Sequence, residues 1–290
     1  MDAEFKSLLI DGDRLAAEFS SRVEAQVRSG TTYNVHAQEE KTVMELSQAL
    51  QGWQDRFKAG TMEIALSDTA HFRRLLFADY QAYSTITTRD SHLHGALLQY
   101  LQRNHSCLKY PGLESVDVLG IWSTSPYPLN EPRLILSSNP NLGMIPGFGW
   151  NPRQRETRGQ NPEPLRGEAD PSPHGADDPV QTSRFLADLL FFQQALTGRP
   201  ADNFEGCPGI NADRARQIRH PFEEAVAQYR EDYDGWKAGL WKAVVAEYQK
   251  AGKDEADALF CARLARICRY ADYDFEKRRV IPWEPPALQK

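Results

Sequence analysis

Serine side chains capable of covalent chemistry cluster near the middle of the chain. Ser123 and Ser125 directly follow an apolar segment, residues 116–122. A serine hydroxyl can act as a nucleophile when a base lies within hydrogen-bond reach. We therefore predict that Ser123 or Ser125 is the nucleophile or oxyanion donor of a metal-independent transferase or hydrolase.

The base that would activate such a serine has three candidates. They are His36, His71 and His220, and spacing alone does not distinguish them. We place His220 in the predicted catalytic set together with the two serines. The four cysteines form no CxxC pair, so the cysteine pattern suggests no metal site. We expect neither a metal nor a cofactor.

Polar and positively charged residues follow a second apolar segment, residues 133–136. Asparagine amides can hydrogen-bond a substrate, and arginines in one loop can clamp a carboxylate or a phosphate. We therefore predict that the substrate is a small anionic or polar molecule and that the reaction is group transfer of an acyl type or hydrolysis. The predicted substrate-binding residues are Tyr127, Asn139, Asn141, Trp150, Arg153 and Arg155.

The same residues have a structural interpretation that competes with the functional one. Serine, asparagine and proline after a strand are ordinary turn residues. The apolar part of the following loop, residues 142–150, would then be a docking patch of a non-enzymatic interaction protein. A polar pocket beneath this segment would favour the enzyme, and a flat apolar surface would favour the interaction protein.

The elements that must position these residues are a few short strands among many helices. Residues 116–122 and 133–136 have the apolar character of buried strands, and residues 61–66 alternate as a short strand does. Apolar residues at helical spacing predict long helices elsewhere, including one over 221–250. The fold class is therefore α/β or α+β, with a small, mostly parallel central sheet and long flanking helices. In such sheets ligands bind beyond the carboxyl ends of the strands.

The chain divides into two predicted regions. Residues 1–60 contain two amphipathic helical patterns and are predicted to form a helical hairpin, and residues 61–290 form the core. Prolines and glycines are dense over 139–181, which predicts a long loop without helix or strand. Its first part, 139–152, is apolar enough to cover a cleft.

The overall composition limits the classes of partner that we expect. The chain has 290 residues, of which 41% are hydrophobic, and a formal net charge of −6. This charge argues against an extended nucleic-acid surface. No apolar run is long enough for a membrane span and no signal peptide is evident, which predicts a cytoplasmic protein. The oligomeric state is not defined by the sequence.

Two short segments resemble known families. Gly120, Ser123, Ser125 and Asn130 are similar to the nucleophile segment of cyclodipeptide synthases. That resemblance implies an enzyme that takes aminoacyl groups from tRNA, with tRNA as carrier of the substrate. Residues 136–140 (LSSNP) resemble the strand and Asn-Pro loop of the uracil-DNA-glycosylase superfamily.

Overall fold

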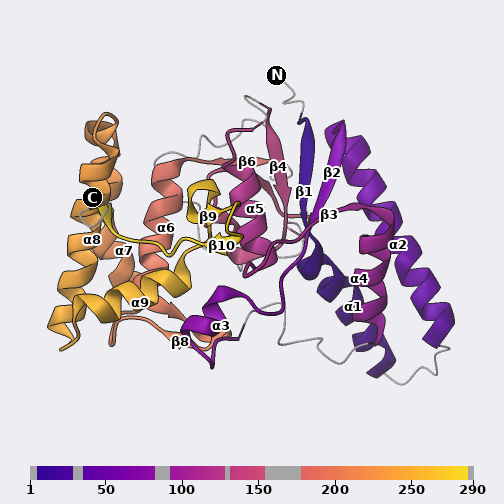
Figure 1. The fold of residues 1–290 in the computed structure, drawn as a ribbon, viewed down its shortest axis with the longest axis horizontal. Coiled ribbons are helices and arrows are strands. Elements are labelled where there is room, and N and C mark those ends of the chain that lie inside the picture. The colour runs from indigo at the N-terminus through magenta and orange to yellow at the C-terminus, as the bar shows by residue number, and fades with distance from the viewer. Residues whose placement is uncertain (1–4, 29–34, 82–91, 128–130, 154–177, 287–290) are drawn as a thin grey trace.

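The computed structural model describes residues 5–28, 35–81, 92–127, 131–153 and 178–286 (Figure 1). Its centre is a six-stranded sheet with the order β3-β2-β1-β4-β5-β6. The first five of these strands are parallel, and β6 pairs with β5 in the antiparallel direction. The strands are β1 (Ser7–Asp11), β2 (Thr61–Ala65), β3 (Ser106–Leu108), β4 (Arg133–Leu136), β5 (Gly147–Trp150) and β6 (Val180–Thr182).

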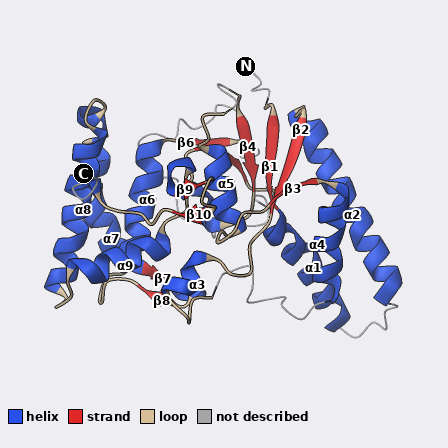
Figure 2. Ribbon diagram, viewed as in Figure 1, coloured by secondary structure: helices blue, strands red, loops and turns tan. Residues whose placement is uncertain are grey.

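Helices cover both faces of this sheet (Figure 2). On one face α1 (Gly12–Arg28), α2 (Val35–Phe57) and α4 (His92–Asn104) pack together, on the right in Figure 1. They share a buried apolar cluster with alternate residues of the strands, such as Leu8 and Ile10. This alternation places the neighbouring residue, Leu9, in the cluster on the opposite face.

The opposite face is covered by α5 (Ser115–Ser123), which contacts β1, β2 and β4. Behind it lies a bundle of helices on the left in Figure 1. Trp236 and Phe192 lie within its core and are 1% exposed, so this second apolar cluster is as fully buried as the first. The bundle consists of α6 (Arg184–Thr197), α7 (Ala212–Glu224), α8 (Tyr233–Lys250) and α9 (Glu255–Ala265).

Short elements connect these layers. The helix α3 (Phe72–Leu76) follows β2, and two-stranded ribbons join β7 to β8 and β9 to β10. The ribbons are β7 (Gly198–Arg199), β8 (Phe204–Glu205), β9 (Tyr273–Asp274) and β10 (Arg279–Val280). The 3₁₀ turns are η2 (Pro140–Met144), η3 (Pro200–Asp202), η4 (Val226–Tyr229) and η5 (Tyr270–Asp272).

The expected fold class is confirmed: the chain is helix-rich α/β with a mostly parallel central sheet. The strands predicted at 61–66 and 133–136 are present as β2 and β4. The first 60 residues also contribute β1, which pairs with both of these strands at the centre of the sheet. None of the helices in the described ranges is long and apolar enough to span a membrane.

Three expected elements differ from the structure. Residues 116–122 are not a strand but most of α5, because a short apolar run suits a buried helix as well as a buried strand. The loop predicted over 139–181 contains β5. Its glycines suit this strand because Ser123 lies close against Gly147 and Leu142 lies close against Gly149, which leaves no room for a side chain. The helix predicted over 221–250 is interrupted at η4, so Pro221 lies inside α7 and α8 begins at Tyr233.

Candidate functional site

The strand order reverses between β1 and β4, at the centre of the sheet. Chains that leave neighbouring parallel strands toward opposite faces open a crevice beyond the carboxyl ends, where ligands bind in open α/β sheets. In this protein β1 ends at Asp11, and Ser137 follows β4. We therefore examined the residues at this strand-end edge as the candidate site.

Asp11 lies at the centre of the edge and is 2% exposed. Its Oδ1 accepts hydrogen bonds from the Ser115 hydroxyl (2.9 Å) and the Arg14 backbone N–H (3.3 Å). Its Oδ2 accepts one from the Ser137 hydroxyl (2.8 Å). Burial, reinforced by the nearby charge of Asp13, raises the pKa of Asp11 to about 6. One carboxylate thus joins the ends of β1 and β4 to the start of α5.

A second aspartate joins β1 to β2. The Asp13 Oδ2 accepts a hydrogen bond from the Ser67 backbone N–H (2.9 Å), and the Ser67 hydroxyl accepts one from the Ser115 N–H (2.9 Å). Burial raises the pKa of Asp13 as well. These bonds hold the loop after β2 against the edge.

Two arginines from different strand ends converge on one glutamate. The Arg14 Nε donates to Glu18 Oε1 (3.0 Å) and to the Ser138 hydroxyl (2.8 Å). The Arg153 Nη1, beyond β5, lies 3.9 Å from the same Glu18 oxygen. The Ser138 hydroxyl also donates to Glu18. Two positive groups and one negative group therefore meet at the crevice between β1 and β4.

A buried arginine organises the adjoining loops. Arg73, from α3, is 2% exposed, and its Nη1 and Nη2 lie 2.6 and 2.8 Å from the two oxygens of Asp117. Its Nη1 also donates to Glu114 (2.5 Å), and its Nε donates to the Leu264 carbonyl (2.9 Å). Burial would raise the pKa of Asp117, but the Arg73 guanidinium more than offsets this and lowers it.

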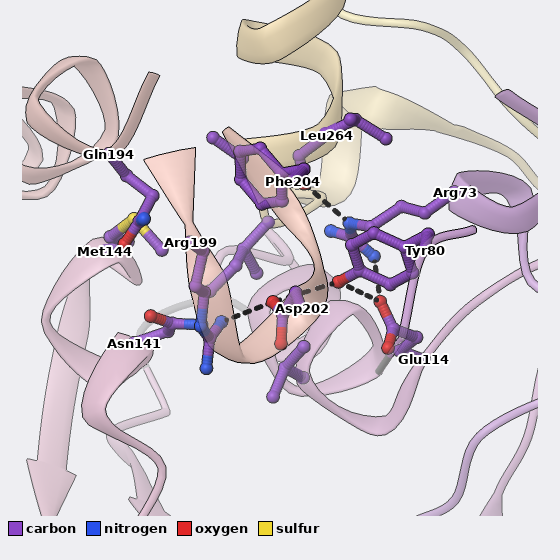
Figure 3. Close-up of a pocket in the computed structure, with 13 residues that line it drawn as sticks. Arg73, Tyr80, Glu114, Asn141, Met144, Gln194, Arg199, Asp202, Phe204 and Leu264 are labelled. Atoms are coloured by element: carbon purple, nitrogen blue, oxygen red, sulfur yellow. Dashed lines mark hydrogen bonds and ion pairs between the residues drawn. The ribbon is translucent and has the colours of Figure 1, made fainter. Parts of the chain in front are cut away.

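A small cavity lies between this arginine and the ribbon of β7 and β8 (Figure 3). Tyr80 Oη donates toward Glu114 (3.3 Å) and Asp202 (3.2 Å), and Arg199 lies 3.0 Å from the same Asp202 oxygen. Burial raises the pKa of Asp202 to about 6, although Arg199 opposes the shift. Asn141 also lines the cavity, so the loop after β4 reaches it.

The predicted catalytic serines lie at the other end of the sheet. Arg133, at the start of β4, donates to the Trp122 (2.8 Å) and Ser125 (2.9 Å) carbonyls, since α5 runs antiparallel to the strands. The Ser123 hydroxyl donates to the Pro146 carbonyl (2.8 Å), just before β5. Ser125 and Tyr127 line a separate, mainly aromatic cavity of about 240 Å³. The structure therefore does not bring them together with the strand-end residues.

The predicted substrate-binding residues divide between edge and core. Asn139 accepts a hydrogen bond from the Asn141 N–H (3.0 Å) and caps η2, and Asn141 and Arg153 lie at the edge as described above. Trp150 is 8% exposed and packs on Phe57, with ring centroids 5.2 Å apart, as a core residue. Arg155 lies outside the described residues.

The predicted bases do not meet the serines either. His220 is exposed on α7, where its Nε2 lies 3.6 Å from Glu224. His71 is buried beside Tyr80, with ring centroids 5.6 Å apart, and burial lowers its pKa. Neither of its ring nitrogens has a hydrogen-bond partner among the described residues. The side chain of His36 lies outside the described residues.

Sequence reasoning missed most of the residues that form the edge. One available signal is the run of apolar residues that ends in Asp11 and Asp13, which has the form of a buried strand followed by acidic residues. Another is the spacing of Glu114 and Asp117, which form a capping box at the start of α5. No local pattern points to Arg73, because its partners lie more than 40 positions away.

The buried charge of Asp11 predicts a pH-dependent stability effect. The pKa rises from 3.8 to about 6 on folding, so the folded state bears the full cost of ionisation above about pH 6 and none below about pH 4. Asp11→Asn should therefore raise the free energy of unfolding by about 2–3 kcal/mol at pH 8, because the serine hydroxyls can reorient toward an amide. Urea denaturation at pH 8 and pH 4 measures this.

The matched control is Asp55→Asn, on the exposed surface of α2. It should change stability by less than about 0.5 kcal/mol at either pH. A gain for Asp11→Asn that is as large at pH 4 as at pH 8 would contradict the assignment of the cost to ionisation.

Comparison with known proteins places this edge in a functional context. No protein-family model matches the chain. The exodeoxyribonuclease of Enterobacteria phage T3 is 21% identical over 307 residues, which cover 96% of this chain and 92% of the relative. The exonuclease of Escherichia phage T7 is 21% identical over 308 residues, which cover 96% and 93%. This chain is similar to phage exonucleases.

Solved structures of phage T5 proteins also match over most of the chain. The T5 5′-exonuclease with bound divalent metal ions (zinc) is 13% identical, covers 90% of this chain and 98% of its own, and has a TM-score of 0.48. The T5 flap endonuclease in a pseudo-enzyme-product complex with DNA and metal ions is 13% identical, with coverages of 88% and 98% and a TM-score of 0.49.

These findings correct the functional expectations. The expected small-molecule enzyme of acyl transfer is wrong, as are a biosynthetic transferase, the cyclodipeptide-synthase alternative and the interaction module. The curated relatives are named as an exodeoxyribonuclease and an exonuclease. The expected small anionic partner and the argument from net charge against nucleic acid fail for the same reason. Both relatives are enzymes, which supports the expectation that this protein is an enzyme. Nothing in the comparisons supports metal-independent catalysis.

Proposed function

We propose that this protein binds DNA, as a deoxyribonuclease must, and that DNA is received at the strand-end edge. The observation that carries the proposal is the end-to-end match to the T3 exodeoxyribonuclease, which covers 96% of this chain and 92% of the relative. The small-molecule interpretation has no comparable support.

The charges at the edge suit a phosphate backbone. Arg14 and Arg153 both lie beside Glu18, at an edge that also holds the buried Asp11 and Asp13. Lys109 follows β3 at the same end of the sheet and is exposed. Arginine and lysine contacts to phosphates supply most of the sequence-independent affinity for DNA. Local cationic side chains therefore allow phosphate contacts by a chain whose net charge is −6.

Neutral hydrogen-bonding groups complete the edge. Ser138 lies between the two arginines, and the backbone N–H of Asn139 donates to the Ser137 hydroxyl (3.0 Å). Hydroxyl, amide and backbone N–H groups commonly contact phosphate oxygens and fix the position of a duplex. This supports the assignment of the Ser-Ser-Asn loop, which the sequence singled out, to contacts with the DNA backbone.

Titration of the purified protein into fluorescently labelled duplex DNA, followed by anisotropy, tests the proposal. We expect saturable binding in the presence of EDTA, with an affinity that falls steeply as salt is raised because phosphate contacts release counterions. Unlabelled duplex should compete, and free nucleoside monophosphates at the same nucleotide concentration should not. Absence of binding at low salt, or equal competition by monophosphates, would refute the proposal.

A further inference from the structure

Several carboxylates lie near the strand-end edge, and arginine side chains bind some of them. This affects whether the carboxylates can bind a metal ion. Enzymes that cleave phosphodiesters commonly hold one or two divalent cations between carboxylates that converge on them. We infer that this protein binds DNA without a divalent-metal centre, because guanidinium groups and hydroxyls hold the carboxylates that would otherwise bind the metal. The inference rests on the proposed function for its DNA-binding part and departs from the curated relatives in the hydrolytic step.

Asp117 shows most clearly that hydrogen-bond donors occupy the oxygens that a metal ion would need. It is fully buried, and each of its oxygens already accepts two hydrogen bonds. Oδ1 accepts from Arg73 Nη2 (2.8 Å) and the Cys268 N–H (2.9 Å), and Oδ2 accepts from Arg73 Nη1 (2.6 Å) and the Glu114 N–H (3.2 Å). A carboxylate so saturated has no lone pair left for a metal ion. The fixed charge of Arg73 also repels a cation at this position.

The neighbouring acids are held in a similar way. Glu114 Oε2 accepts from Arg73, and Asp202 Oδ2 faces Arg199 at 3.0 Å. The single Tyr80 hydroxyl proton lies within reach of both oxygens and is donated to one of them. Figure 3 shows these side chains directed at one another across the cavity. Only Oδ1 of Asp202 is buried there without a hydrogen-bond partner among the described residues. One free oxygen does not make a coordination shell.

The strand ends offer no replacement set. Asp11 receives hydroxyl donors from Ser115 and Ser137, Asp13 receives the Ser67 N–H, and Glu18 is bound by Arg14. The loop after β4 supplies only neutral serine and asparagine side chains. Within the described ranges, no three histidine, cysteine, aspartate or glutamate residues converge as a metal site would require. The residues present therefore do not fit a divalent-metal centre.

Two measurements on the full-length protein test the inference. In the first, Mn²⁺ is titrated into the protein alone, and electron paramagnetic resonance reports the free hexa-aqua ion. In the second, the duplex titration is repeated in EDTA and in Mg²⁺ at matched ionic strength, with excess protein, and the DNA is then run on a denaturing gel. We expect no saturable Mn²⁺ binding, affinities within about twofold of each other, and intact DNA.

The other possible results distinguish failure of the inference from failure of the proposed function. Saturable Mn²⁺ binding that Asp11→Asn or Asp202→Asn abolishes, or Mg²⁺-dependent cleavage of the bound duplex, would overturn the inference and leave the proposed DNA function standing. No DNA binding under either condition would overturn the proposed function and the inference with it. Asp55→Asn serves as the matched control for the metal titration, since Asp55 lies exposed on α2.

Discussion

Replacing Arg73 with methionine should lower the free energy of unfolding by about 3–5 kcal/mol, because it leaves two buried carboxylates without their counter-charge. Arg73 is 2% exposed and bonds to Asp117, Glu114 and the Leu264 carbonyl. Methionine retains the length and apolar character of the stem, so the loss reports mainly on the guanidinium. Urea denaturation followed by tryptophan fluorescence measures the effect.

The control for this variant is Arg103→Met, on the exposed surface of α4, with an expected change below about 0.5 kcal/mol. A second variant tests the cause. Adding Asp117→Asn and Glu114→Gln to Arg73→Met removes the unpaired charges and should restore part of the lost stability. A loss below about 1 kcal/mol for Arg73→Met, or no recovery in the triple variant, would show that the cluster does not depend on charge pairing.

The parts of the fold that the sequence predicts well are those with an unambiguous period. The strand at 61–66 alternates between apolar and polar residues, which is a pattern that a strand satisfies and a helix does not. The run 116–122 is different, because a short segment with five of its seven residues buried fits a strand or a helix. Assigning it to a strand reversed the direction of this segment and placed Ser123 and Ser125 at the wrong end of the sheet.

The candidate site was predicted in part. Asn139, Asn141 and Arg153 lie at the strand-end edge because they follow β4 and β5, and that relation can be read from the order of the chain. Asp11 and Arg73 can be recognised as site residues only when the topology of the fold is known. Asp11 gains importance because β1 lies at the centre of the sheet, and Arg73 because α3 and α5 meet across 44 positions of sequence. Neither relation has a local pattern.

Arg14 and Arg153 give the other large expected effect, since they converge on Glu18 from the ends of two strands. Replacing both with glutamine should weaken duplex binding by about hundredfold or more, because hydrogen bonds to charged groups contribute about 1.5–3 kcal/mol each. The salt dependence should also become shallower by about two phosphate contacts. Arg103→Gln is the matched control, because α4 ends at the opposite edge of the sheet, just before β3.

The affinity of the Arg14→Gln, Arg153→Gln double variant for labelled duplex DNA, relative to wild type and to Arg103→Gln, is the most direct test of the strand-end edge as the place where DNA binds. Circular dichroism and melting temperature confirm that all three proteins are folded. The predicted result is a loss of at least about hundredfold for the double variant and an unchanged affinity for Arg103→Gln. Equal affinities for all three proteins would contradict the account.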